Sequence, residues 1–218
     1  MTEPVAVRKR RGCLFFGCLG GTVCLVIILV AFLLGLYQLK KMLTFYTDPQ
    51  PMALPTVKMS QADIDTLKQR VESFQDAVRT GRPTEPLTVT SDEINAYIQN
   101  DPNLAGVKGK VYVTIEGDRV KSQVSLPLDD LGFRVFHGRY LNGVGIFALN
   151  LQRGNLVVTA ESLVVKGKPL PAVYMDKFKS QNLADAFNKN PRVSVALSHL
   201  QEIRVADGKL TLVPKLEQ

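Results

Sequence analysis

The chain has 218 residues, of which 45% are hydrophobic and 22% are charged, and its formal net charge is +7. Most of that charge lies at one end, because residues 1–41 carry a net +5 and residues 42–218 carry only +2. A nucleic-acid-binding domain concentrates its basic residues on the folded part, so this distribution argues against that class and predicts no nucleic-acid partner.

The first predicted element is a transmembrane helix at residues 12–39, which follows a basic tail at residues 1–11. The 28 residues of this run contain no charged side chain, and about 20 residues suffice to cross roughly 30 Å of hydrocarbon. Four basic residues precede the run, whereas only Lys40 and Lys41 follow it closely, which predicts a cytoplasmic N-terminus. A cleavable signal has a core of roughly 7–15 apolar residues, so we expect an uncleaved signal anchor. The expected location is the cell membrane, with an extracytoplasmic C-terminal domain in the periplasm or at the cell exterior.

The predicted membrane helix contains all three cysteines of the chain, Cys13, Cys18 and Cys24. We therefore expect no disulfide and no thiolate metal site in the rest of the protein. The small residues Cys13, Gly17 and Gly21 recur every four positions, a spacing that lets two membrane helices approach closely. They are the candidate helix contact of a homo-oligomer. The alternative is that glycine is simply frequent in membrane helices.

Residues 40–59 have the composition of a linker between the membrane helix and a domain at residues 60–218. Pro49, Pro51 and Pro55 interrupt any helix there. At about 3.1 Å per residue, an extended chain from residue 42 to residue 59 reaches up to roughly 50 Å. We therefore expect a spacer that can hold the domain away from the bilayer.

The domain begins with a predicted helix at residues 61–80, with Ser60 as its N-cap and Gly81 at its end. Apolar residues recur along this helix at spacings of three and four, and form one narrow stripe: Ile64, Leu67, Val71, Phe74 and Val78. The stripe fits packing on the domain's own sheet. A coiled-coil seam with a second copy is the alternative.

The remaining sequence predicts an α+β domain in which a mainly antiparallel, hairpin-rich sheet packs against helices. After a short strand at 87–90 and a helix from Ser91, alternating apolar residues and turn signals predict three hairpins, which turn at residues 116–118, 153–155 and 207–208. A helical patch lies between the second and third hairpins. Residues 191–200 fit either a helix or a strand, since Val193, Val195 and Leu197 alternate.

Motifs for catalysis are absent from the sequence. The two histidines, His137 and His199, lie in no zinc-ligand spacing, and there is no phosphate-binding glycine loop or nucleophile elbow. We therefore predict no catalytic residue, no cofactor and no metal, and expect that the protein is not an enzyme.

One polar segment stands out, residues 136–143 with the sequence FHGRYLNG. It gathers His137, Arg139, Tyr140 and Asn142 where the second hairpin begins. These four residues are the candidate ligand or partner surface. The alternative is that they form a loop and the solvent face of a strand.

Several segments resemble the bacterial YpmS-like and LmeA-like membrane-anchored proteins. They are LTVTSDEINAYI at residues 87–98, VVKGKPLP at 164–171 and the closing hairpin IRVADGKLTLVP at 203–214. The resemblance implies an extracytoplasmic domain related to tubular lipid-binding folds, which associates with lipid or envelope polymer. The matching positions are Asn95, Gly167, Pro169 and Pro171, all with structural roles.

Two functions of different classes follow from these features. The first is a membrane-tethered, non-catalytic binding domain that takes an acyl chain or another amphiphile between sheet and helices. The second is a structural or assembly subunit of a membrane or envelope complex. The expected partners are therefore the lipid bilayer, a lipid ligand, and a second copy or another membrane-complex protein.

Overall fold

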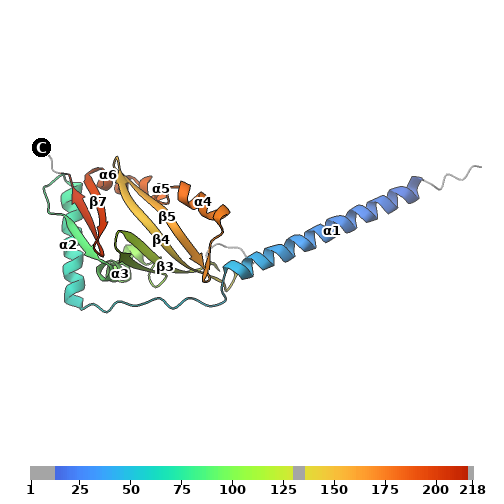
Figure 1. Ribbon diagram of the computed structural model, residues 1–218, viewed down its shortest axis with the longest axis horizontal. Coiled ribbons are helices and arrows are strands. Elements are labelled where there is room, and N and C mark those ends of the chain that lie inside the picture. Colours follow the sequence, from blue (N-terminus) through green and yellow to red (C-terminus); the bar gives the residue numbers. More distant parts are fainter. Residues whose placement is uncertain (1–12, 130–135, 216–218) are drawn as a thin grey trace, which may run out of the picture. The chain divides into compact units, whose positions relative to one another are not determined.

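The computed structural model describes residues 13–129 and 136–215 (Figure 1). Within these ranges, side chains are described from Ile28 onward, apart from those of Leu39, Met42 and Arg192. The chain divides into two compact units, residues 1–45 and residues 46–218.

Helix α1 (Cys13–Tyr46) makes up the described part of the first unit and ends at the first residue of the second. Its segment Ile28–Tyr46 is the one helix of the described chain that is long and apolar enough to cross a membrane. Large apolar side chains of this segment are exposed, with Ile28 at 66% and Tyr37 at 64%. These properties are compatible with a membrane anchor and also with a signal sequence.

The helix continues seven residues beyond residue 39. The sequence predicts its end at residue 39, because the uncharged run stops there. Residues 40–46 contain neither glycine nor proline, and the Thr44 hydroxyl donates to the Lys40 carbonyl at 2.8 Å. The linker therefore starts at Thr47. The candidate helix-contact residues Cys13, Gly17 and Gly21 lie within α1, but their side chains are outside the described residues.

The second unit contains six helical elements and eight strands in its described part. The helical elements are α2 (Gln61–Arg79), α3 (Ser91–Asn100), the 3-10 turn η1 (Pro102–Leu104), α4 (Ala172–Ser180), α5 (Asp185–Asn188) and α6 (Pro191–Ser198). The strands are β1 (Leu87–Thr90), β2 (Val111–Glu116), β3 (Arg119–Pro127), β4 (Tyr140–Gln152), β5 (Asn155–Val165), β6 (Lys168–Pro169), β7 (Leu200–Ala206) and β8 (Lys209–Pro214). The predicted α+β class is confirmed.

The strands form two antiparallel sheets, where the sequence predicted one. The larger sheet has the order β2-β3-β4-β5-β6 and the smaller one β1-β8-β7. The three hairpins turn where predicted, and the last one uses Asp207 and Gly208, both with positive φ (51° and 73°), as a two-residue hairpin loop requires. The second sheet arises because β1 pairs with β8, more than a hundred residues away, and no local pattern encodes that pairing.

Helix α2 covers the smaller sheet and buries its apolar stripe inside the domain. The Ser60 hydroxyl caps the helix by accepting from the Asp63 backbone N–H at 3.2 Å. Leu67, Phe74 and Val78 are buried in a core shared with β1, β7, α3 and α6. The stripe therefore packs inside the domain, which is the first of the two interpretations of the sequence.

Asparagine side chains act as substitute strand partners at the β2 edge of the larger sheet and along the part of β5 that β6 does not cover. At β2, the amide of Asn95 in α3 donates to the Val113 carbonyl (2.6 Å) and accepts from the Val113 N–H (2.8 Å). The Ser91 hydroxyl accepts from the Ile115 N–H at 2.8 Å. An open strand edge invites association with other chains, so these contacts remove that risk at β2.

Helices α4, α5 and α6 lie along β5, as Figure 1 shows. Asn182 accepts from the Val158 N–H (2.9 Å), and Asn188 accepts from the Leu156 N–H (3.0 Å). Residues 191–198 form helix α6, and the strand β7 begins only at Leu200. The open choice for this segment is thus settled as a helix followed by a strand.

Glu93 links α3 to α2 and makes a pH-dependent contribution to the stability of the domain. Its carboxylate accepts from the Thr90 N–H at 2.8 Å and pairs with Arg70 at 2.6 Å. Burial alone raises the pKa of Glu93, but the hydrogen bond from Thr90 and the charge of Arg70 outweigh it, so the pKa is lowered. This stability is complete above the ordinary glutamate pKa and is lost as the pH falls through the folded-state pKa.

We therefore expect Glu93→Gln to lower the free energy of unfolding by about 0.5–1 kcal/mol at pH 7. The difference should shrink towards pH 3, because protonation of the wild-type carboxylate removes the charge that the variant lacks. Urea titrations of both proteins at the two pH values measure it. The exposed Glu85, changed to Gln, provides the control with no expected difference. An equal deficit for Glu93→Gln at both pH values would contradict the linkage.

Candidate functional site

An apolar cavity of about 570 Å³ lies in the second unit. Its volume falls within the roughly 300–1,000 Å³ typical of small-molecule sites. It is lined by Val71, Phe74, Gln75, Val78, Arg79, Leu87, Leu149, Leu156, Phe187, Val193, Val195, Ala196, Leu197, Leu200, Ile203, Leu210 and Leu212. The cavity is thus formed by α2, the smaller sheet, α5, α6 and the ends of β4 and β5 that meet at their turn.

Local sequence patterns place these side chains. On α2, spacings of three and four direct Val71, Phe74 and Val78 to one face. On β8, Leu210 and Leu212 are two residues apart and so point to the same face of the sheet. The cavity is therefore an extension of the hydrophobic core between a helix and a sheet.

The exposed part of the cavity lining includes both polar and apolar side chains. Four lining residues are exposed and therefore lie where the cavity opens to solvent, namely Gln75 and Arg79 on α2, Phe187 on α5, and Val195 on α6. The exposed fractions of Phe187 and Val195 are 52% and 50%. Among the described side chains of the lining, Gln75 and Arg79 are the only polar ones, and none is acidic. Such a site suits a ligand with an apolar body and a polar end.

Further apolar side chains are exposed in the chain segment that precedes α5 and α6. Val173, Tyr174, Phe178 and Leu183, on α4 and the segment after it, are exposed. We refer to these four residues, together with Phe187 and Val195, as the exposed face of α4–α6. Exposed apolar side chains that gather in a patch mark contact sites for lipid or protein.

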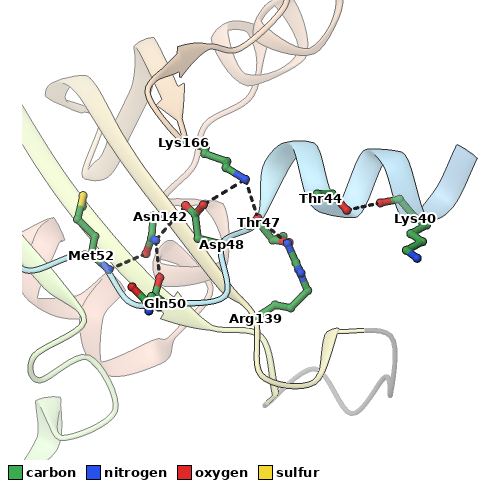
Figure 2. Close-up of polar contacts among 9 residues, drawn as sticks. All are labelled: Lys40, Thr44, Thr47, Asp48, Gln50, Met52, Arg139, Asn142 and Lys166. Carbon is green, nitrogen blue, oxygen red and sulfur yellow. Dashed lines mark hydrogen bonds and ion pairs between the residues drawn. The ribbon is translucent and has the colours of Figure 1, made fainter.

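The predicted surface at residues 136–143 lies elsewhere, where it binds the chain's own linker (Figure 2). Arg139 donates from Nη2 to the Thr47 carbonyl at 2.7 Å and from Nε to the Thr47 hydroxyl. Tyr140 and Asp48 exchange two backbone hydrogen bonds of 2.7 and 2.8 Å. The linker therefore joins the sheet as a single antiparallel bridge.

We call the contacts that hold residues 47–52 against the sheet the linker clamp, and Asn142 lies at its centre. Its Nδ2 donates to the Asp48 carboxylate (3.1 Å) and to the Gln50 carbonyl (2.9 Å). Its Oδ1 accepts from the Met52 N–H (3.1 Å) and from the Ser125 hydroxyl (2.8 Å). A side-chain amide has two donor and two acceptor positions, so all four are used.

Lys166 adds charge to the clamp, since its Nζ lies 3.2 Å from the Asp48 carboxylate and 3.4 Å from the Thr47 carbonyl. His137 does not take part; its side chain is 87% exposed and its Nδ1 lies 2.7 Å from Asp129 Oδ1. The clamp thus unites Arg139, Tyr140 and Asn142 and leaves His137 aside. Thr47 to Met52 do not form the free spacer that the prolines predicted.

Sequence reasoning missed the cavity because its lining comes from segments far apart in the chain. Two signals were present: the stripe on α2 and the apolar residues 193–197. Neither reveals whether the space between them is filled. In the part of the chain that the structure describes, no three His, Cys, Asp or Glu side chains group as a metal site would require.

Comparison with known proteins gives no further guide to the site. No protein-family model, curated protein or solved structure matches the chain.

Proposed function

We propose that this protein is a single-pass membrane protein whose extracytoplasmic domain binds an acyl chain or another amphiphile in the apolar cavity, without catalysis. The observation that carries the proposal is the cavity itself, about 570 Å³ of space lined almost entirely by aliphatic and aromatic side chains. Water in such a space finds few hydrogen-bond partners, so an apolar ligand gains free energy by replacing it.

Other features of the chain favour a nearby membrane as the source of such a ligand. Helix α1 is long and apolar enough to span a bilayer, and the basic residues before it favour a cytoplasmic N-terminus. A domain tethered beside a membrane meets acyl chains at high local concentration.

Photolabelling of the full-length protein in lipid vesicles tests this proposal. A fatty acid with a photoreactive group along its chain is added in trace amounts, and labelled peptides are mapped by mass spectrometry after irradiation. We expect label in the peptides of α2, α6, β7 and β8. Absence of label from all four elements would contradict the proposal.

A cavity-filling substitution makes the test specific. Ala196 is half-buried and lines the cavity. Ala196→Phe should lower the labelling of these peptides about tenfold, because the phenyl ring takes up space that the probe needs. Ala186 is exposed on α5 and does not line the cavity. Ala186→Phe is therefore the matched control, which should leave the labelling unchanged.

The exposed face of α4–α6 favours a second function, as an assembly subunit of a membrane or envelope complex. Val173, at 82% exposure, is the most exposed apolar side chain of that face. A cavity that stays unlabelled, together with a specific chemical crosslink from α4 to another membrane protein, would favour this alternative.

A further inference from the structure

The exposed polar residues of the cavity lining, Gln75 and Arg79, indicate which head group the ligand has. This inference rests on the proposed function, because it concerns the same cavity. Gln75 and Arg79 are four residues apart on α2, so they lie one above the other on one face of the helix. The exposed part of the lining also includes the apolar Phe187 and Val195.

Arg79 can bind an anion at this position. Its side chain is 71% exposed, and its Nη2 lies 2.8 Å from Asp76 Oδ1. Within the described residues, this contact with Asp76 is the one hydrogen bond of the Arg79 side chain. The planar guanidinium binds carboxylates and phosphates through pairs of parallel hydrogen bonds. Gln75 adds a neutral donor beside it, which a carboxylate or phosphate oxygen can also use.

We propose that the cavity binds a single-chain anionic amphiphile, with its acyl chain inside and its carboxylate or phosphate head group on Arg79. The described lining contains Arg79 and no acidic residue, which favours an anionic head group over a cationic one. The volume of about 570 Å³ is that of a drug-sized ligand. One long acyl chain is a ligand of that size, whereas a phospholipid with two chains is about twice as large.

Asp76 competes with the ligand for Arg79. Both side chains are exposed, so their ion pair contributes little to folding. A bound anion shares the guanidinium with Asp76 or displaces it. Removal of the Asp76 charge therefore strengthens the binding of an anionic head group and leaves a neutral one unaffected.

The test compares two photoreactive probes, palmitic acid and hexadecanol, with the full-length protein in zwitterionic vesicles. Cavity labelling is divided by the labelling of the vesicle lipid, which corrects for the different partition of the probes. We expect the acid to label the cavity peptides about tenfold more than the alcohol. Arg79→Gln should remove this preference by lowering only the acid signal, and Asp76→Asn should increase the acid signal.

Arg82 is the matched control, since its side chain is exposed, donates to the Thr80 hydroxyl and lies outside the lining. Arg82→Gln should keep the preference. Equal labelling by acid and alcohol, unchanged in Arg79→Gln, would overturn the head-group assignment while the proposed function stands. No cavity label from either probe would overturn the proposed function itself. Excess inorganic phosphate should not compete, and strong competition would indicate an anion site that needs no acyl chain.

Discussion

Replacement of Asn95 by Leu should destabilise the domain by about 3–5 kcal/mol, the largest effect we expect from a single polar side chain. Asn95 is 1% exposed, and it satisfies both the N–H and the carbonyl of Val113 at the edge of β2. Leucine has nearly the same shape but no polar atoms. The substitution therefore leaves the N–H and the carbonyl of Val113 without their partner, beside a side chain that is itself buried.

Urea titration of the full-length protein in detergent micelles measures this loss, followed by tyrosine fluorescence because the chain has no tryptophan. Among the described residues, the side chain of Asn100, the last residue of α3, donates only to the Ala96 carbonyl one turn back. Asn100→Leu should therefore change the stability by less than about 0.5 kcal/mol. A loss below 1 kcal/mol for Asn95→Leu would mean that its amide does not close the sheet edge.

Replacement of Asn142 by Ala should release the linker from the sheet and cost about 2–4 kcal/mol of stability. The side chain is buried, and all four of its hydrogen-bonding positions are used, three of them on the linker. Hydrogen exchange followed by mass spectrometry should reveal at least a tenfold loss of protection in the linker peptides. The backbone bridge between Asp48 and Tyr140 weakens because the clamp no longer aligns it.

Asn150 provides the control on the same strand. It is exposed and lies on β4 eight residues after Asn142. Asn150→Ala should therefore leave linker exchange and stability unchanged. Wild-type protection of the linker in Asn142→Ala would show that the clamp does not hold this segment.

Sequence patterns predicted those parts of the fold that depend on neighbours in the chain. The stripe on α2, its Ser60 cap and the turn at Asp207 and Gly208 all use contacts within a few residues, and all were found. The division into two sheets was not predictable, because β1 joins β8 across the length of the domain. The end of α1 was placed too early because the loss of apolar character at Lys40 does not stop a helix.

The candidate site was predictable only in part, for the same reason. The polar segment 136–143 was recognised. The sequence does not reveal whether an asparagine binds a ligand or another part of the chain, as Asn142 does. Asn95 carries no local sign that it closes a strand edge. The resemblance to membrane-anchored lipid-associated proteins stays a prediction, as does the contact through Cys13, Gly17 and Gly21.

The central claim is that an acyl chain enters the cavity, and paramagnetic NMR tests it most directly. Full-length protein with labelled Val and Leu methyl groups is placed in nanodiscs and titrated with spin-labelled stearic acid. We predict broadening of the lining methyl groups, such as those of Leu210 and Leu212, which unlabelled stearic acid reverses. Broadening confined to Val173 on the exposed face of α4–α6, with sharp signals from the lining, would contradict the claim.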